Sequence, residues 1–198
     1  MTRFSLDTVP ATPWKNGGGT TREIASWPPG AGLDDFQWRI SVATIGASGP
    51  FSRFAGIDRT IMLIDGDGVH LRAPDGSIDH RLDVPLAPFA FSGDTPLDCT
   101  LLGGTSQDIN VMTRHGALQA QVHVMRRPHT LDRCAHGLLL ALRGSWVVRL
   151  RPGDDDAVRL EAHQGLWWAE QPCTAHIEPA SDDAVLVAVS IETGATVS

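Results

Sequence analysis

The sequence predicts an all-β protein built as two small antiparallel β-barrels in tandem. Twenty glycines and 13 prolines divide the 198 residues into segments too short for ordinary helices. Several segments alternate apolar and polar residues as half-buried strands do. Short strands separated by turns at spacings of about 8 to 12 residues are typical of sandwiches and barrels. A chain of this length buries roughly 70–75% of its unfolded surface, which is enough for two small barrels that share an interface.

The expected strands follow one another along the chain. The segment WRISVATI (38–45) alternates between bulky apolar residues on one face and Arg39 and Ser41 on the other. The segment RTIMLIDGDGVHL (59–71) reads as a hairpin, because two apolar strands flank an Asp-Gly-Asp-Gly turn. Further strands are expected within residues 88–104, 109–127, 137–150 and 160–192.

A faint internal duplication supports the tandem arrangement. The hairpin around IDGDGVHL (64–71) recurs in weaker form as ALRGSWVVRL (141–150), and each is followed by a loop and a glycine-containing segment. A period of roughly 80 residues implies one barrel per repeat. We therefore predict an N-terminal barrel over residues 1–116, which carries the candidate site, and a C-terminal barrel over residues 117–198.

Composition restricts the classes of partner. A net charge of −7 without a basic stripe argues against nucleic-acid binding. No stretch of about 18 apolar residues could cross a membrane, and the N-terminus lacks the apolar core of a signal peptide. Cys99, Cys134 and Cys173 show no CxxC spacing, so free thiols in the cytoplasm are expected. The partners expected are small molecules or proteins, and a homodimer stays open.

Three segments carry a resemblance to a known family. PWKNGGGTTREIA (13–25), WRISVATIGASGPFSRFAGIDRTIMLIDGDG (38–68) and DINVMTRHG (108–116) look like the HutD/Ves family of bacterial proteins, with a match from about residue 4 to residue 192. The resemblance implies a bicupin, that is, two cupin barrels of the jelly-roll type. It also implies a role in limiting flux through histidine degradation by binding an intermediate such as N-formylglutamate or urocanate.

Metal chemistry is not indicated. Cupin enzymes usually hold a divalent ion through an HxH pair, a glutamate and a later histidine, and no two of the eight histidines here have HxH spacing. His163 and His176 could meet across strands, but ordinary hydrogen bonds are the favoured interpretation. We therefore expect no metal and no cofactor.

The three consecutive glycines, Gly17 to Gly19, raise a separate question. One interpretation is an anion-binding nest, in which bare backbone amides turn toward a ligand. The other is a wide bulge where the chain crosses a sheet edge. The motif is not a P-loop, because Lys15 precedes the glycines.

The candidate site is a set of cations and hydrogen-bond donors in the N-terminal half. If Arg39 faces the lumen, it needs a buried acid such as Glu23 or Asp58, or an anionic ligand. A carboxylate fits, because the guanidinium can bind it through two parallel hydrogen bonds. The predicted ligand-binding residues are Trp14, Lys15, Asn16, Gly18, Arg22, Arg39, Ser41, Arg59 and Asn110.

Three functions stay open. The first is a non-catalytic regulator that binds a small carboxylate metabolite, which the lack of a recognisable nucleophile or acid–base pair favours. The second is an isomerase or hydrolase that uses Lys15 as base or electrophile and Glu23 or Asp58 as proton carrier. The third is an interaction protein whose first barrel is filled by side chains.

Overall fold

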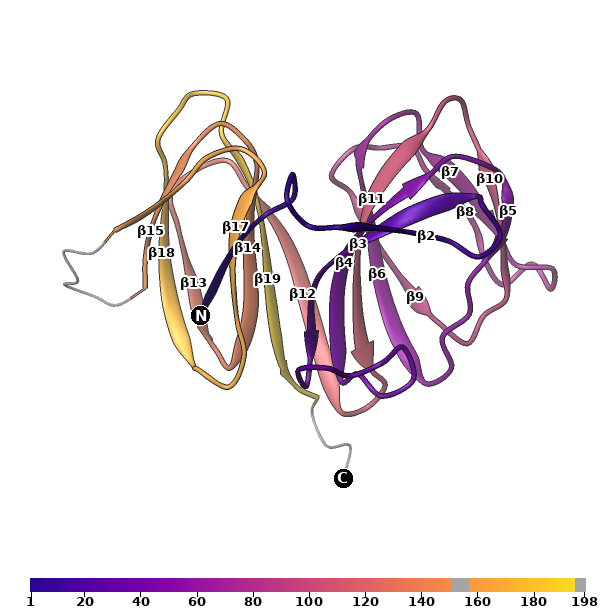
Figure 1. Cartoon of the computed structure of the whole chain (residues 1–198), viewed down its shortest axis with the longest axis horizontal. Helices are drawn as coiled ribbons and strands as arrows, with labels where there is room; N and C mark the ends of the chain where they lie inside the picture. The colour runs from indigo at the N-terminus through magenta and orange to yellow at the C-terminus, as the bar shows by residue number, and fades with distance from the viewer. Residues whose placement is uncertain (151–156, 195–198) are drawn as a thin grey trace. The chain divides into compact units, whose positions relative to one another are not determined.

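The computed structural model describes residues 1–150 and 157–194, and these residues form 19 β-strands and no α-helix. They therefore contain no helix that could cross a membrane. The chain divides into two compact units (Figure 1). We call residues 10–119 the N-terminal barrel, and residues 1–9 together with 120–194 the C-terminal barrel. The all-β prediction is confirmed.

The N-terminal barrel consists of two antiparallel sheets. The six-stranded sheet has the order β2 (Ala11–Pro13), β3 (Gly19–Trp27), β4 (Trp38–Ile45), β11 (Ser106–Arg114), β6 (Ile57–Asp65) and β9 (Pro88–Ser92). The four-stranded sheet has the order β5 (Gly49–Phe51), β10 (Leu97–Leu101), β7 (Val69–Arg72) and β8 (Asp79–Leu82). The two strands predicted over 59–71 are present as β6 and β7, but they join different sheets and do not pair, so the predicted hairpin is wrong: the Asp-Gly-Asp-Gly segment carries the chain from one sheet to the other. Strand β3 was not predicted.

The C-terminal barrel also has two sheets. The five-stranded sheet has the order β1 (Thr2–Ser5), β17 (Gln164–Trp168), β14 (His136–Arg143), β19 (Val185–Thr193) and β12 (Leu118–Met125). The four-stranded sheet has the order β13 (His129–Cys134), β18 (Cys173–Pro179), β15 (Trp146–Arg149) and β16 (Val158–Leu160).

The two sheet orders show the internal duplication directly. The order β4-β11-β6-β9 in the N-terminal barrel corresponds to β12-β19-β14-β17 in the C-terminal barrel, and β5-β10-β7-β8 corresponds to β13-β18-β15-β16. Each strand thus has its counterpart eight strands later. Strand β11 begins at Ser106 and β19 at Val185, which agrees with the expected period of roughly 80 residues.

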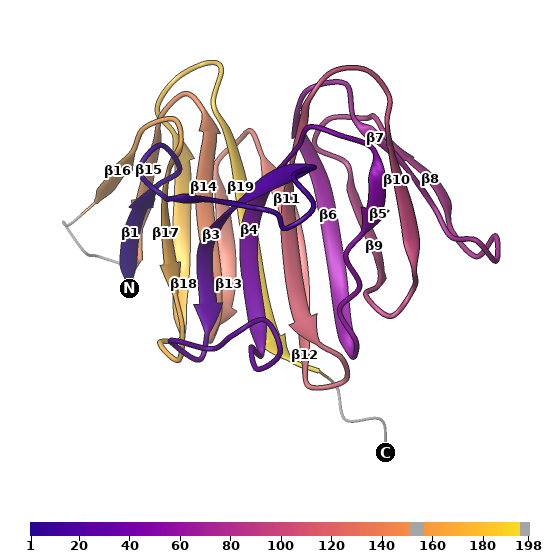
Figure 2. The same cartoon turned by 45° about the vertical axis from the view of Figure 1, so that its right-hand side comes forward.

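The first nine residues do not belong where the sequence placed them. We assigned them to the N-terminal barrel, but β1 pairs antiparallel with β17, with Thr2 opposite Trp167 and Ser5 opposite Gln164 (Figure 2). The side chain of Arg3 also donates a 2.7 Å hydrogen bond to the carbonyl of Arg159. Short-range patterns cannot reveal this pairing, because the two strands lie far apart in the sequence.

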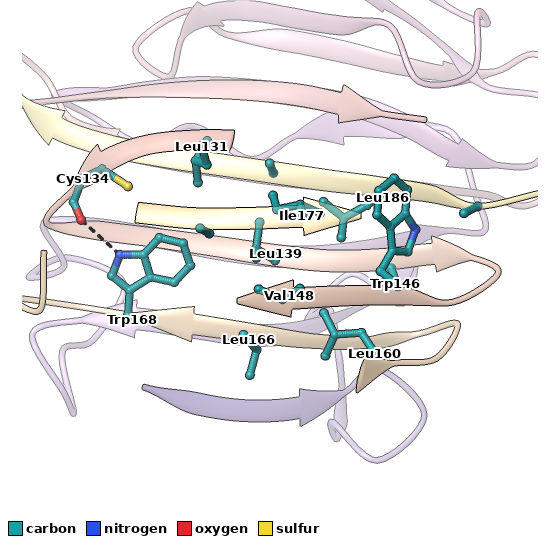
Figure 3. Packing of buried hydrophobic residues seen from close by; sticks show 14 residues of the cluster. Leu131, Cys134, Leu139, Trp146, Val148, Leu160, Leu166, Trp168, Ile177 and Leu186 are labelled. Atoms are coloured by element: carbon teal, nitrogen blue, oxygen red, sulfur yellow. Dashed lines mark hydrogen bonds between the residues drawn. The ribbon is translucent and has the colours of Figure 1, made fainter. Parts of the chain in front are cut away.

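Each barrel has its own hydrophobic core between its two sheets. The N-terminal core includes Ile45, Ile61, Leu63, Leu71 and Cys99. The C-terminal core is larger and wholly apolar in side-chain type (Figure 3): Leu131, Cys134, Leu139, Ala141, Trp146, Val148, Leu160, Leu166, Trp168, Ala175, Ile177, Ala184, Leu186 and Ala188. Among the residues that the structure describes, buried charged side chains occur in the N-terminal barrel and not in the C-terminal barrel.

Candidate functional site

The inner face of the six-stranded sheet carries polar side chains on three adjacent strands. Ser41 on β4 lies opposite Asn110 on β11, and Met112 on β11 lies between Arg39 on β4 and Arg59 on β6. This face points to the core, because Ile45, Ile61 and Leu63 share it. Arg39 and Ser41 therefore face the barrel interior, which is the condition under which an acidic partner or an anionic ligand is expected: Ser41 is fully buried and Arg39 nearly so.

Arg59 lies deep in this barrel. Its residue surface is 3% exposed, and its guanidinium carbon lies 4.6 Å, 5.2 Å and 5.0 Å from the ring centroids of Phe51, Phe54 and Phe91. One guanidinium nitrogen donates a 2.9 Å hydrogen bond to the carbonyl of Ser52. Its Nε has no hydrogen-bond partner among the residues that the structure describes. Burial lowers the pKa of Arg59 to about 10, although the charge of Asp108 opposes the change.

Asp108 is the unexpected member of the site. It is 2% exposed, and neither of its carboxylate oxygens has a hydrogen-bond partner in residues 1–150 and 157–194. Burial raises its pKa to about 7, while the charge of Arg59 acts in the opposite direction. The side-chain oxygen of Asn110 is also buried without a partner in the described chain. We call Arg59, Asp108 and Asn110 the polar cluster.

Such a cluster is costly unless its polar atoms find hydrogen-bond partners. A buried polar group without a hydrogen bond costs about 1–3 kcal/mol, and a charged group costs more. Native proteins retain unpaired groups of this kind mainly where a ligand, an ion or ordered water completes them. The polar cluster is therefore the strongest structural indication of a binding site in this barrel.

A cavity of about 270 Å³ lies in the same barrel, and none of Arg59, Asp108 and Asn110 lines it directly. Phe51 and Cys99 line it, and both connect it to the cluster: the Phe51 ring contacts Arg59, and the charge of Asp108 contributes to the raised pKa of Cys99. Burial is the larger cause of that shift, to about 12, so the thiol stays protonated. The full lining is Trp14, Asn16, Gly17, Gly18, Ile45, Ala47, Ser48, Gly49, Pro50, Phe51 and Cys99.

Arg39 already has an acidic partner. Its Nε donates to a carboxylate oxygen of Glu23 at 2.6 Å, and a second nitrogen lies 3.5 Å from the hydroxyl of Ser41. Glu23 was one of the two acids expected to pair with an inward arginine. The other, Asp58, instead accepts a hydrogen bond from exposed His115, which raises the pKa of that histidine.

The glycine segment forms the hairpin turn between β2 and β3. The amide of Gly17 donates to the carbonyl of Trp14, and the amide of Gly18 donates to the side-chain oxygen of Asn16. Gly17 has φ +72°, and a Cβ on Gly19 would stand 2.3 Å from the carbonyl oxygen of Thr44. Two of the three amides thus already have acceptors, and the bare backbone is explained by the turn and by its close approach to β4.

The predicted residues of the glycine segment separate in space. Trp14, Asn16 and Gly18 line the cavity, and the indole nitrogen of Trp14 donates to Thr21 at 2.8 Å. Lys15 is exposed and does not line the cavity. Arg22 pairs with Val42 and so lies on the opposite face of the sheet from Ser41. The segment therefore contributes a tryptophan, an amide and backbone to the site, and no cation.

The C-terminal barrel provides an internal comparison. In each barrel a register shift interrupts the pairing of the two central strands. In the N-terminal barrel these strands are β11 and β6, and the shift lies next to the Asp108–Leu63 pair. In the C-terminal barrel they are β19 and β14, and the shift lies next to the Leu186–Ala141 pair. Aligning these shifts puts Leu186, Ala188 and Gly137 at the positions of Asp108, Asn110 and Arg59, respectively. Every polar member of the cluster is thus replaced by an apolar residue or glycine. The polar interior is a property of the N-terminal barrel.

Sequence reasoning missed Asp108, although the signal was present. In DINVMTR (108–114), the inward positions alternate from Asp108 through Asn110 to Met112, and we had selected Asn110 from that row. The histidines considered for a metal have separate partners: His163 contacts Asp7, and His176 contacts Thr130. Within the described residues, no group of three or more potential ligands could hold a metal ion.

The cupin expectation is tested by comparison with solved structures. A cupin 2 conserved barrel domain protein from Leptotrichia buccalis superimposes with a TM-score of 0.60 at 8% identity, covering 96% of each chain. At this identity the similarity concerns the fold alone. It confirms the cupin-like architecture that the family resemblance implied.

Similarity in sequence and structure identifies the family. The HutD family model matches residues 6–187. Protein Ves of Escherichia fergusonii is 38% identical over 169 residues, which cover 85% of this chain and 83% of Ves. A conserved protein of unknown function from Pseudomonas aeruginosa PAO1 has a TM-score of 0.83 at 34% identity, covering 96% of this chain and 98% of its own. HutD from Pseudomonas fluorescens SBW25, solved in a formate condition, has a TM-score of 0.80 at 29% identity, covering 97% and 98%. The chain therefore belongs to the HutD family.

Proposed function

We propose that this protein binds a small carboxylate metabolite in the N-terminal barrel without converting it, and that occupancy limits histidine degradation. The sensed compound would be an intermediate such as N-formylglutamate or urocanate, bound without a metal. The observation that carries the proposal is Arg59, a buried cation whose Nε has no partner in the described residues and whose guanidinium contacts Phe51, a residue that lines the cavity.

The chemistry of Arg59 supports a carboxylate as the ligand. Phe51, Phe54 and Phe91 surround the guanidinium and contact it through their rings, so they provide no hydrogen-bond acceptor. The unpartnered Nε–H requires an acceptor, and a carboxylate is a strong, charge-assisted acceptor for a guanidinium. The low-polarity surroundings strengthen such a contact relative to one in water.

Two further observations agree with this proposal. The cavity volume of about 270 Å³ suits a ligand smaller than a typical drug molecule. The C-terminal barrel lacks every polar member of the cluster, so one binding site per chain is expected.

Thermal unfolding of the purified protein tests the proposal. N-formylglutamate, urocanate, glutamate and histidine would be added to the wild type, to Arg59→Lys and to Arg72→Lys, the last an exposed arginine of the same barrel. A ligand at a hundred times its Kd adds about 2.7 kcal/mol, which raises the midpoint by several degrees for a chain of this size. We expect a shift in the wild type and in Arg72→Lys that Arg59→Lys loses. No shift with any compound in folded wild-type protein would refute the proposal.

A catalytic role is the second candidate, and the raised pKa of Asp108 favours it. A carboxyl group with a pKa of about 7 can exchange a proton at neutral pH with a bound molecule that contacts it. The acid–base residues first considered do not meet there, since Lys15 is exposed and Asp58 pairs with His115. Proton NMR of the binding compound, followed for hours at stoichiometric protein, separates the two roles. Unchanged resonances support the sensor, and product signals that Asp108→Asn abolishes support the enzyme.

A further inference from the structure

We infer that Cys134 and Cys173 form a site of oxidative modification, at which a low-molecular-weight disulfide such as oxidised glutathione closes a disulfide bond between β13 and β18. The bond would join two strands of the four-stranded sheet in the C-terminal barrel and stabilise that barrel. Cys99, Cys134 and Cys173 are free thiols in the structure. The inference concerns the C-terminal barrel alone and does not depend on the proposed function.

The strand register places the two cysteines directly opposite each other. Strands β13 and β18 are antiparallel, and Cys134 pairs with Cys173 just beyond a register shift that follows Leu131. Directly opposed residues in an antiparallel pair have Cα atoms about 4.5 Å or 5.5 Å apart, depending on their place in the hydrogen-bond pattern. Both separations lie within the range of about 4.4–6.8 Å that a disulfide bond spans. The Cα separation expected at this position therefore permits the bond.

The two side chains also lie on the same side of the sheet. Cys134 is 2% exposed and belongs to the core of the C-terminal barrel, and half-buried Cys173 packs against the same core. The carbonyl of Cys134 accepts a 3.2 Å hydrogen bond from the indole nitrogen of Trp168, which holds the backbone of β13 in place (Figure 3). The pair thus combines a buried thiol with one that a small molecule in solution can reach.

Cys99 provides a contrast within the same chain. It lies in β10 of the N-terminal barrel, where its strand partners are Gly49 and Leu71, and it is 4% exposed. Neither of its strand partners is a cysteine, and it belongs to the other hydrophobic core. Cys99 is therefore the internal control for the pair.

The oxidation proceeds as two thiol–disulfide exchanges. The thiolate of Cys173 attacks one sulfur of the external disulfide, breaks its S–S bond and releases one thiolate, which takes up a proton. The thiolate of Cys134 then attacks the sulfur of Cys173, forms the new bond and releases the second external thiolate, which also takes up a proton. The two protein thiols are thereby oxidised, and one external disulfide is reduced to two thiols. Burial raises the pKa of both cysteines, that of Cys134 to about 11, so slow exchange is expected at neutral pH.

Peptide mapping of the folded protein tests the inference, because trypsin places the three cysteines in separate peptides. Cleavage after arginine gives residues 82–114, residues 134–143 and a peptide that starts at Leu160, each with one cysteine. The wild type, Cys99→Ala, Cys134→Ala and Cys173→Ala are equilibrated, while folded, in a buffer with equal concentrations of reduced and oxidised glutathione. Free thiols are then alkylated before digestion and mass spectrometry.

We expect the peptides of Cys134 and Cys173 to be joined by a disulfide in the wild type and in Cys99→Ala, while Cys99 of the wild type is alkylated. Cys134→Ala should instead carry glutathione on Cys173, because the second exchange has no attacking thiol. Cys173→Ala, a change at a half-buried position, should show no linked peptides. Alkylation of both Cys134 and Cys173 in the oxidised wild type would overturn the inference, and so would a wild type that keeps glutathione on Cys173 or links Cys99 to another cysteine.

Thermal unfolding of the same samples tests the expected stabilisation. The bond closes a loop over residues 135–172 and so restricts the unfolded chain. The oxidised wild type and oxidised Cys99→Ala should therefore unfold about 5 °C or more above their reduced forms. Cys134→Ala should have nearly the same midpoint in both states. A linked wild type whose midpoint falls or stays unchanged would overturn the proposed stabilisation.

Discussion

The indole ring of Trp168 fills the space next to Gly137, where a Cβ atom would stand 2.3 Å from a ring carbon. Gly137 corresponds to Arg59 of the N-terminal barrel, and Trp168 corresponds to Phe91, because the two pairs occupy equivalent register positions. The C-terminal barrel thus fills with an aromatic ring the region where the N-terminal barrel holds a cation. The duplicated fold has kept its strands and changed its interior.

Gly137→Ala should destabilise the C-terminal barrel. The added methyl group would overlap the Trp168 ring, and overpacking of this kind costs about 1–3 kcal/mol. Chemical denaturation followed by tryptophan fluorescence would measure the change. Gly32→Ala is the control, since the nearest atom to its added Cβ would be 3.9 Å away. Equal midpoints for the two variants would contradict the packing described here.

Asp108→Asn should stabilise the ligand-free protein at high pH. The folded-state pKa of Asp108 is raised to about 7 from an ordinary value near 4, so the folded protein binds more protons than the unfolded chain between these values. The contribution of Asp108 to stability therefore falls as pH rises from about 4 to about 7 and stays low above it. We expect the variant to gain on the order of 2–4 kcal/mol at pH 8 relative to pH 4.

Denaturation midpoints at pH 4, 6 and 8 would test this, with Asp98→Asn as the control. Asp98 is exposed, so its replacement should leave the pH profile almost unchanged. A wild-type profile that is parallel to that of Asp108→Asn across this range would show that Asp108 titrates normally. Greater stability without ligand would accompany weaker binding, because the same unpaired carboxylate causes both effects.

Arg59→Lys should weaken ligand binding more than Arg39→Lys. Arg59 retains an unpartnered Nε, whereas Arg39 already donates to Glu23 at 2.6 Å. Loss of a charge-assisted hydrogen bond costs about 1.5–3 kcal/mol, which corresponds to roughly tenfold or more in Kd. Calorimetric titration with the compound that gives the largest thermal shift measures both variants. An effect confined to Arg39→Lys would place the carboxylate at the Glu23 end of the barrel.

The three glycines of the β2–β3 turn should respond unequally to alanine. Gly17→Ala is strained by its positive φ and should cost about 1–2 kcal/mol. Gly19→Ala should cost more, because its Cβ would overlap the Thr44 carbonyl oxygen at 2.3 Å and touch Trp14. Gly18→Ala, with its nearest atom at 3.4 Å, should be nearly neutral. Equal costs at all three positions in thermal denaturation would argue against this turn geometry.

The sequence predicts the strand content well because alternation and turn residues are local signals. Residues 38–45 form the expected strand, residues 59–71 form two strands that join different sheets in place of the expected hairpin, and Gly116 and Gly144 adopt the positive φ of the expected turns. The candidate site was predicted only in part, because the register between paired strands decides which residues belong to it. Alternation identifies the inward face on which Ser41 and Asn110 lie, but the pairing of β4 with β11 and β6 decides which residues meet. Asp108 was overlooked because the sequence of one strand does not show that its carboxylate is buried. Its burial depends on the pairing of β11 with β4 and β6.

The pairing of β1 with β17 has a consequence for the order in which the chain can fold. During synthesis, residues 2–5 leave the ribosome before the other strands that the structure describes, but their partners at residues 164–167 emerge only after the whole N-terminal barrel. All strands of the N-terminal barrel have been synthesised much earlier, so that barrel can form while β1 is still unpaired. Closing such a long loop is entropically costly and slow. Strand β1 therefore stays unpaired until late, and a chain that lost its first five residues would leave the edge of β17 exposed to other strands.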